Sequence, residues 1–477
     1  MVKSCCSRSF LTNPEAFVSE HTTTQCVLFP GIFKRPVIAK FDQSEGSSDG
    51  GAVLLKAADR KLGLITALAA CLKDDRQEAK VRHEIDELLT QRIMAIACGY
   101  EDANDAPRLA SDPVHKLLVG RDPVDGEDLA SQSTLSRFEN SVGRKELFRM
   151  GEALADTVIE RHRKRLHGCA RLITLDLDPT DDPTHGAQQL TFFNWHYDSY
   201  CYLPVVGFLT FNHEAEQYLV TAVLRPGNAP GSKGAVGLLR RLIDRLREAF
   251  PEAKIRVRLD GGFAAPEVLY FLDCEPRVEY LVNFAANAVL ERKAESDMKR
   301  ARRKSKISGQ TEHVYGECPY RTRKTWPWKR RVIYKAEVVR TEGKKPKDNP
   351  RFVVTNMRQS PQWLYEEVYC QRGDLENRIK ELHYGMEIGR TSCTSFWANQ
   401  LRVLMTAAAY VLMQELRSGL AGTASARAQV SILRERFLKI GAHVVASVRR
   451  IVLHLPQSFP YLHNFRRLAM RLSAQTG

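Results

Sequence analysis

Three acidic side chains in this sequence have the residue types and the setting that phosphoryl transfer requires. Asp178 and Asp260 each end a strand-like segment, residues 171–178 and 254–260, and Glu376 lies in a segment that reads as a helix. Hard cations such as Mg²⁺ prefer carboxylate oxygen, and a pair of them stabilises both the attacking and the leaving oxygen of an in-line displacement. Two strand carboxylates and one helix carboxylate therefore predict a site for two divalent ions.

The helix that carries Glu376 has an unusual polar face. Steps of three and four residues place side chains on the same side of a helix. A solvated charged face is the ordinary explanation of such a pattern, but the two upstream aspartates favour a functional one. The residues on this face are Tyr369, Arg372, Glu376, Lys380 and His383.

The first strand offers two candidates for one acid. Its alternation puts Thr174, Asp176 and Asp178 on one face. Asp176 is therefore the alternative to Asp178 as a metal ligand.

The elements around these acids read as three strands, a helix, a strand, a helix and a strand. Hairpins followed by helical crossovers predict an α/β fold with a mixed sheet and helices on both faces. The strands are expected at residues 171–178, 203–211, 217–224, 254–260 and 278–284, with a returning strand at 351–355, and the helices at 234–250 and 264–272. Further helices are expected at 57–72, 81–98, 147–162, 396–416 and 425–439, and a strand pair at 442–455.

Composition and charge restrict the class of protein. The 477 residues carry a formal net charge of +15, and such a surplus of cations favours nucleic acid as the partner, with an anionic membrane surface as the weaker alternative. The apolar run at 403–413 is about half the length that spans a bilayer, and residues 1–30 lack the apolar core of a signal peptide. A cytoplasmic location without membrane contact is expected, and eleven scattered cysteines fit reduced thiols.

A basic, aromatic segment interrupts the regular pattern after residue 284. Cations in it would bind the phosphate backbone, and Arg302, Arg303 and Lys304 are the candidates. An exposed indole stacks on an unpaired base, which makes Trp326 and Trp328 candidates, with packing of the segment's own core as the alternative.

A second DNA-binding element is expected near the N-terminus. Small polar residues at 128–136 precede Arg137, as in the recognition helix of a helix-turn-helix motif, and Ser131 is placed to cap that helix. An ordinary connecting helix is the alternative. The loop at 225–234 has the wrong spacing for a phosphate-binding loop, so no nucleotide cofactor is expected.

The sequence resembles the DDE transposases of bacterial insertion sequences, and specifically the thirteen-eighty family. That signature is Tyr, two residues, Arg, three residues, Glu, six residues, Lys; Tyr369, Arg372 and Glu376 match it, whereas His383 holds the Lys position, with Lys380 one turn earlier as a substitute. The resemblance covers roughly residues 35–460. Its motifs are LDLDPTDDPTHG at 175–186, Asn194 with YCYLP at 200–204, RLDGGFA at 258–264, and 369–376.

The resemblance implies an RNase H-like catalytic domain that is split by an insertion. The first acid would be Asp178 by its Asp-x-Thr context, followed by Asp260 and Glu376, with two Mg²⁺ or Mn²⁺ ions per active site. Tyr369 and Arg372 would bind phosphates, and an insertion Trp would hold a flipped base. The implied partners are double-stranded DNA, as element ends and target, and a second copy of the chain in a homodimer.

The domain organisation expected from these patterns has six parts. They are an irregular segment at 1–50, a helical DNA-binding region at 51–165, the first part of the core at 166–284, the basic insertion at 285–350, the second part of the core at 351–416, and a C-terminal region for dimerisation at 417–477. Two other functions remain open, a domesticated DNA-binding protein without transposition activity and a standalone metal-dependent DNA nuclease. The presence of all three acids disfavours the first of these.

Overall fold

A nine-stranded mixed sheet forms the centre of the chain. The computed structural model describes residues 26–29, 32–35, 37–322 and 325–473. The strand order is β12-β13-β15-β11-β10-β4-β8-β9, and β14 pairs with β13. β10 is parallel to β4 and β11, whereas β8 and β9 continue the sheet antiparallel. The predicted α/β class with a mixed sheet is confirmed, with strands β4 (Leu172–Pro179), β8 (Val205–Phe211), β9 (Tyr218–Val223), β10 (Lys254–Leu259) and β11 (Val278–Phe284).

Apolar alternation explains why these segments become the inner strands. Ile173, Leu175 and Leu177 of β4 are fully buried. The crossover helix α8 (Ala235–Ala249) buries a leucine-rich stripe and keeps its arginines outward, as a helix packed on a sheet does. α9 (Pro266–Cys274) makes the second crossover.

The free edge of β9 is covered by the buried helix α13 (Phe396–Gly419). Gln414 Oε1 accepts from the Leu219 N–H at 3.1 Å, and Gln400 Oε1 accepts from the Leu224 N–H at 2.7 Å. An unpaired strand edge invites pairing with another chain, and these amides satisfy it within the fold. The predicted buried helix at 396–416 is confirmed.

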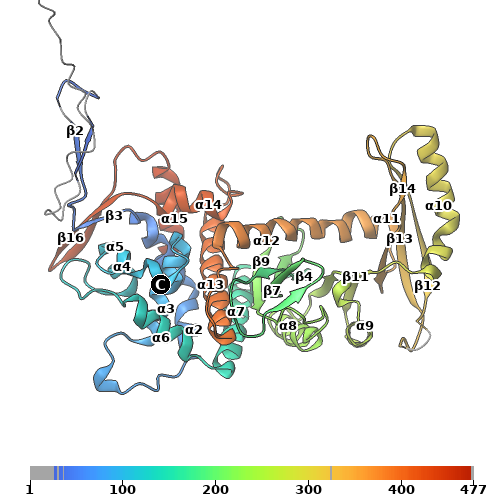
Figure 1. Cartoon of the computed structure of the whole chain (residues 1–477), viewed down its shortest axis with the longest axis horizontal. Coiled ribbons are helices and arrows are strands. Elements are labelled where there is room, and N and C mark those ends of the chain that lie inside the picture. Colours follow the sequence, from blue (N-terminus) through green and yellow to red (C-terminus); the bar gives the residue numbers. More distant parts are fainter. Residues whose placement is uncertain (1–25, 30–31, 36, 323–324, 474–477) are drawn as a thin grey trace, which may run out of the picture.

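The basic segment is a lateral extension of the same sheet. β13 pairs with β15, and β15 pairs with β11, so the sheet runs on without a break. With α10 these strands form the lobe at one end of the molecule (Figure 1). The elements are α10 (Ala288–Ser308), β12 (Glu312–Tyr320), β13 (Arg330–Val339), β14 (Lys347–Asp348) and β15 (Arg351–Thr355).

A long helical run joins this lobe to α13 (Figure 1). It comprises α11 (Pro361–Trp363), a π-helical turn at Leu364–Tyr369, a 3-10 turn at Cys370–Arg372, and α12 (Gly373–Met386). The predicted helix is therefore present, but it is not regular near Tyr369, where the signature begins. The π-helical turn there is wider than an α-helix, and the 3-10 turn that follows is tighter. Such π turns are frequent at functional sites.

Helices at the N-terminal end form the opposite lobe, together with the C-terminal elements (Figure 1). The single helix predicted at 57–72 is wrong, because Gly63 adopts φ 68° and divides it. The helices of this lobe are α1 (Val53–Leu62), α2 (Leu64–Ala69), α3 (Ile85–Cys98), α4 (Ala106–Leu109), α5 (Pro113–Val119), α6 (Gln132–Ser141), α7 (Arg144–Arg165), α14 (Val430–Leu433) and α15 (Leu462–Ser473).

Short strands complete the fold. The predicted C-terminal strand pair is confirmed, and β3 adds to it. The helix predicted at 425–439 is only α14 and a π-helical turn. No helix in the described ranges is both long and apolar enough to cross a bilayer. The remaining strands are β1 (Cys26–Phe29), β2 (Val37–Lys40), β3 (Gly46–Ser47), β5 (Asp182–Pro183), β6 (Phe192–Asn194), β7 (Ser199–Tyr202), β16 (Ala442–Ser447) and β17 (Arg450–His454).

Candidate active site

Asp178 and Asp260 meet at the carboxyl ends of two adjacent parallel strands. Leu177 of β4 is in register with Leu259 of β10, and each acid is the next residue along its chain. Burial raises the pKa of Asp178 to about 7, and although Arg372 opposes the shift, the negative charge of Asp260 adds to it. The fold therefore concentrates negative charge at this edge of the sheet.

The backbone holds the Asp260 carboxylate in a tight turn. Asp260 Oδ1 accepts from the Gly262 N–H at 2.9 Å and starts the 3-10 turn Gly261–Phe263. The loop at 225–234 packs against this turn so closely that a Cβ on Gly231 would lie 2.5 Å from the Gly262 carbonyl oxygen. The glycine-rich loop therefore packs against the turn that holds Asp260 and supports it.

Arg372 is paired with the first acid. Its Nη2 donates to Asp178 Oδ1 at 2.5 Å, and both side chains are about 15% exposed. The guanidinium of Arg372 thus serves as the countercharge of Asp178, while its Nε has no partner among the described residues, and the phosphate contact of Arg372 stays a prediction. Tyr369 lies one turn earlier, and its pKa is raised mainly by burial.

Asp176 belongs to a buried ion pair. Arg258 Nε and Nη2 each donate to one Asp176 oxygen at 2.7 Å, and neither side chain is more than 5% exposed. Arg258 Nη1 also donates to the Val368 carbonyl at 2.8 Å, in the π-helical turn. Both oxygens of Asp176 are thus engaged, which leaves Asp178 as the candidate ligand on β4.

Glu376 lies on the exposed side of α12, one turn after Arg372. Among the described residues, the oxygens of Asp178, Asp260 and Glu376 are not all within 4.8 Å of one another. The structure therefore brings Asp178 and Asp260 together at adjacent strand ends. Glu376 lies on α12, which begins directly after Arg372, the partner of Asp178.

His383, at the signature's Lys position, bonds within the protein. Its Nε2 is 2.8 Å from Thr180 Oγ1, and burial lowers its pKa, so the ring is neutral at pH 7. One ring nitrogen of His383 is thus bonded to the Asp178-Pro-Thr180 segment, and a DNA contact of His383 stays a prediction. Lys380, by contrast, is exposed on the same helix.

The two insertion tryptophans are engaged within the protein. Trp326 is only 3% exposed, packs against Phe284 and Tyr320, and has the Arg330 guanidinium 4.5 Å from its ring centroid. Trp328 is 42% exposed, and its indole N–H donates to Asp273 Oδ2 at 3.1 Å. The prediction that Trp326 stacks on a base is wrong for this conformation, since the ring is core.

The three basic candidates on α10 differ in their surroundings. Arg302 is paired with Glu295 at 2.8 Å and with Asp348 at 2.6 Å, and these hydrogen bonds raise its pKa, Asp348 more than Glu295. Arg303 and Lys304 are exposed beside it. Arg302 therefore has less free positive charge to offer than its neighbours.

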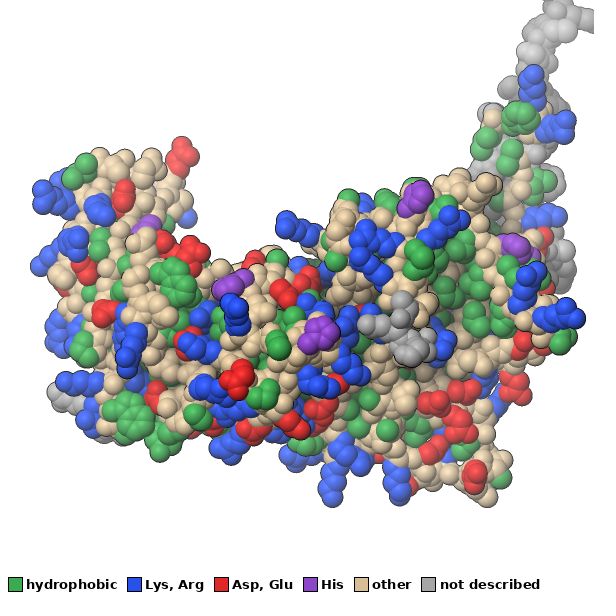
Figure 2. Space-filling model, turned by 180° about the vertical axis from the view of Figure 1, so that it is seen from behind, with side chains coloured by type: hydrophobic (Ala, Val, Ile, Leu, Met, Phe, Trp, Pro, Cys, Tyr) green, Lys and Arg blue, Asp and Glu red, His purple; other side chains and the backbone are tan. Residues whose placement is uncertain are grey.

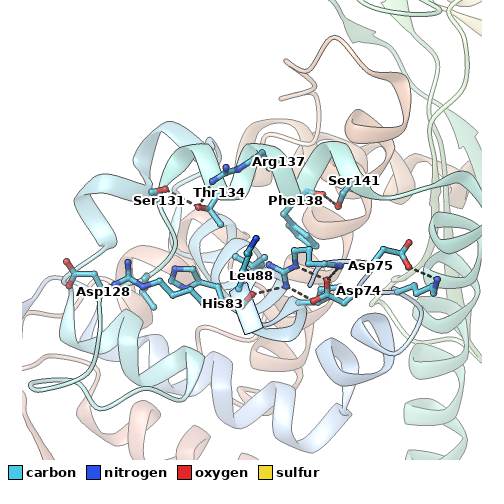
Figure 3. Close-up of a pocket in the computed structure, with 16 residues that line it drawn as sticks. Asp74, Asp75, His83, Leu88, Asp128, Ser131, Thr134, Arg137, Phe138 and Ser141 are labelled. Carbon is cyan, nitrogen blue, oxygen red and sulfur yellow. Dashed lines mark hydrogen bonds and ion pairs between the residues drawn. The ribbon is translucent and has the colours of Figure 1, made fainter. Parts of the chain in front are cut away.

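Arg137 borders a cavity of about 840 Å³ in the N-terminal lobe. Figure 3 shows it on α6 with Ser131 and Thr134, across the cavity from Asp74. Its Nη2 donates to Thr134 Oγ1 at 3.3 Å, and Ser131 bonds neighbouring hydroxyls instead of capping the helix. The lining mixes acidic and basic side chains.

A buried cluster elsewhere resembles a metal site but is already neutralised. Ligand atoms of Asp49, Cys98 and His115 lie within 4.8 Å of one another. His115 Nε2 is 2.8 Å from one Asp49 oxygen, and Lys439 Nζ is 2.8 Å from the other. Because the Lys439 ammonium group already lies beside Asp49, this cluster links three segments of the chain through polar contacts.

Two features of the site were not predicted from local sequence patterns. The Arg258 pair with Asp176 requires the register of β4 against β10, which alternation alone does not fix. Asp182 is 1% exposed, accepts from the Thr391 hydroxyl at 2.8 Å, and has a pKa raised to about 8 by burial. Asp182 is thus a buried group of the segment that follows the first acid.

The donor set at Asp178 and Asp260 fits a divalent cation. Both donors are carboxylates, which hard cations prefer, and the pKa of Asp178 is raised, first by burial and then by the charge of Asp260, despite the opposing effect of Arg372. A cation between these groups would relieve the burial cost and the repulsion.

Comparison with known proteins finds one family whose model matches nearly the entire chain. A sequence model described as transposase DDE domain group 1 matches residues 29–476. None of the curated proteins compared with the chain matches it. Members of such a family are polynucleotidyl-transferase-type enzymes that generally use divalent metal ions. With the match extending over nearly the entire sequence, the chain belongs to the group 1 family of transposase DDE domains.

Proposed function

We propose that the protein is a DNA transposase of the thirteen-eighty type that binds the terminal inverted repeats of its own insertion sequence, cleaves the strands and joins them to target DNA. The observation that carries the proposal is the meeting of Asp178 and Asp260 at adjacent strand ends beside the helix of Glu376, in a chain of this family. The sheet and its crossovers serve as an RNase H-like core that is split by the basic segment.

Asp178, Asp260 and Glu376 would hold two Mg²⁺ or Mn²⁺ ions. When bound, such ions activate water or a 3′ hydroxyl and neutralise charge on the leaving oxygen. The protein's own part is to fix these carboxylates, through the Asp260 turn and the Arg258 contacts. Arg372 balances Asp178 before the ions bind, and the exposed Lys380 faces outward for a phosphate.

The shape of the molecule supports a path for DNA between its two lobes. Figure 2 shows a broad hollow between the lobe of the basic segment and the lobe of the terminal elements, with Lys and Arg side chains around it. In Figure 1 the helical segment from α11 to α12 extends between the same two lobes. Double-stranded DNA in this hollow would contact both lobes, and joining two ends calls for a homodimer.

The first test is excision and joining of a marked segment flanked by the element's own genomic ends, in Mg²⁺. The wild type is expected to yield joined products, and Glu376→Ala to reduce them by about 1000-fold or more, since a lost ligand removes several kcal/mol of transition-state stabilisation. End binding in EDTA should persist in both proteins.

Other products would point to other functions. Cut ends that never join target DNA would indicate a nuclease, and binding by the wild type without cutting would indicate a domesticated binder. Cutting by both proteins would remove Glu376 from the site.

The salt dependence of DNA binding tests the basic face of α10. Each phosphate contact contributes about 0.9 to the slope of log K against log salt. Replacing Arg303 and Lys304 with alanine is expected to shallow the slope by up to about two units, because both side chains are exposed. Arg302→Ala is the matched control, expected to change the slope little, because Glu295 and Asp348 already neutralise that charge. An unchanged slope in the double variant would exclude this face from the interface.

A further inference from the structure

The strand that carries the first acid is followed by an aromatic hairpin with an exposed indole at its tip. β6 and β7 pair antiparallel, and the turn between them begins at Trp195. Trp195 is 88% exposed, against 42% or less for each of the other four tryptophans. A single exposed apolar side chain is ordinary, so its placement decides whether it has a role.

Close contacts through the loop at 225–234 connect the turn at Trp195 with the turn that holds Asp260. Asn194, next to Trp195, donates through Nδ2 to the Gly227 carbonyl at 2.8 Å. A Cβ on Gly227 would lie 2.0 Å from the Cys201 carbonyl oxygen, so loop and hairpin are in close contact. Four residues later, Gly231 of the same loop packs against Gly262 in the Asp260 turn.

Tyr197, in the same turn, lies within the electrostatic reach of the acids. Burial raises its pKa to about 12, and the charges of Asp181, Asp178 and Asp260 add to the shift. The short strand β5, which begins four residues after Asp178, pairs with β7 and so joins the hairpin to the segment that follows the first acid. The tip is therefore a fixed neighbour of the acid pair.

Within the described part of the chain, one aromatic contact supports the indole. Phe193 meets Trp195 in an edge-on contact with ring centroids 4.9 Å apart, and Phe193 meets Tyr200 in the same way at 5.4 Å. Since Trp195 remains 88% exposed, most of its ring surface is open, and Tyr200 is 61% exposed beside it. A ring held from one side and open on the other is a stacking platform.

We propose that Trp195 stacks on an unpaired base at the DNA end while the strand is positioned at Asp178 and Asp260. The faces of a paired base are covered by its neighbours in the duplex, so an open indole beside strand-cutting acids matches a base that has left the stack. Trp326 does not offer such a face, because it is core. The inference rests on the proposed function and names a positioning residue for it.

The test uses full-length wild type, Trp195→Ala and Trp195→Phe, with Trp363→Ala as the matched control of a partly exposed tryptophan on α11. The probe is a duplex of the element's genomic end with 2-aminopurine at the terminal position, bound in EDTA. Wild type and Trp363→Ala are expected to quench the probe, Trp195→Ala to lose the quenching, and Trp195→Phe to keep part of it.

Cleavage in Mg²⁺ provides the second readout. Trp195→Ala is expected to cut the paired end about 5- to 150-fold more slowly, the range that one stacked base is worth, and to recover on an end whose terminal pairs are mismatched. Equal quenching by wild type and Trp195→Ala, or equal losses on paired and mismatched ends, would overturn the inference. Quenching that depends on Trp195 in a wild type that never cuts would preserve the inference and reject the transposase.

Discussion

Asp178→Asn is expected to abolish DNA cleavage and, at the same time, to stabilise the folded protein above pH 7. Asparagine keeps the size of the side chain but supplies no negative charge for a cation, so cleavage should fall by about 1000-fold or more. The carboxyl is costly to ionise in the fold, because burial and Asp260 raise its pKa to about 7 despite Arg372. Activity and stability are therefore predicted to change in opposite directions.

The direction of the stability effect follows from proton linkage. A carboxyl whose pKa is about 3.8 in the unfolded chain and about 7 in the fold binds its proton more tightly in the fold. Its contribution to stability is fully present below pH 3.8 and is lost as the pH rises through 7. Without added metal, the wild type should lose on the order of 3 kcal/mol relative to Asp178→Asn between pH 4 and pH 8.

Urea denaturation of both proteins at a series of pH values, in EDTA, measures this difference. Adding Mg²⁺ at pH 8 should stabilise the wild type and leave Asp178→Asn nearly unchanged, because a ligand that binds only the folded state stabilises it. A free-energy difference that stays constant with pH, or a variant that still cuts, would show that Asp178 is not the charged group of the site.

The strands beside Asp178 and Asp260 could be predicted, because apolar alternation marks both of them in the sequence. β11 begins and ends where alternation placed it, at Val278 and Phe284, and β10 differs by one residue. Apolar alternation is a local signal, so it survives without knowledge of the fold. The carboxyl ends of neighbouring parallel strands then meet of necessity.

The misplaced residues depend on partners far away in the chain. His383 bonds Thr180 across 203 positions, and Arg258 pairs with Asp176 across 82. Trp326 was a candidate for base stacking, with packing in the segment's own core as the alternative, and it packs against Phe284 in that core. Strand register and tertiary packing determine these contacts, and neither can be predicted from the local amino-acid composition.

Breaking the Asp176–Arg258 pair is expected to cause the largest loss of stability among these changes. Arg258→Met would leave Asp176, which has no exposed surface, without its partner. An unpaired buried charge typically costs about 3 to 5 kcal/mol. Arg256→Met, two residues earlier on β10, is the matched control and should cost roughly 1 kcal/mol, since its pair with Glu279 is partly exposed.

Removing both charges separates the stability of the fold from the positioning of the site. The double variant Asp176→Leu/Arg258→Met leaves no unpaired charge, so it is expected to recover most of the lost free energy of unfolding. It still lacks the donor to the Val368 carbonyl, which ties β10 to the turn that leads into Arg372 and Glu376. Cleavage should therefore stay at least about tenfold below wild type while end binding is retained, because a displaced ligand weakens the transition state more than the bound ground state. Full cleavage by a stable double variant would mean that Arg258 only neutralises Asp176 and that the helix of Glu376 is positioned from its other end, where Glu381 accepts from the Tyr410 hydroxyl at 2.7 Å.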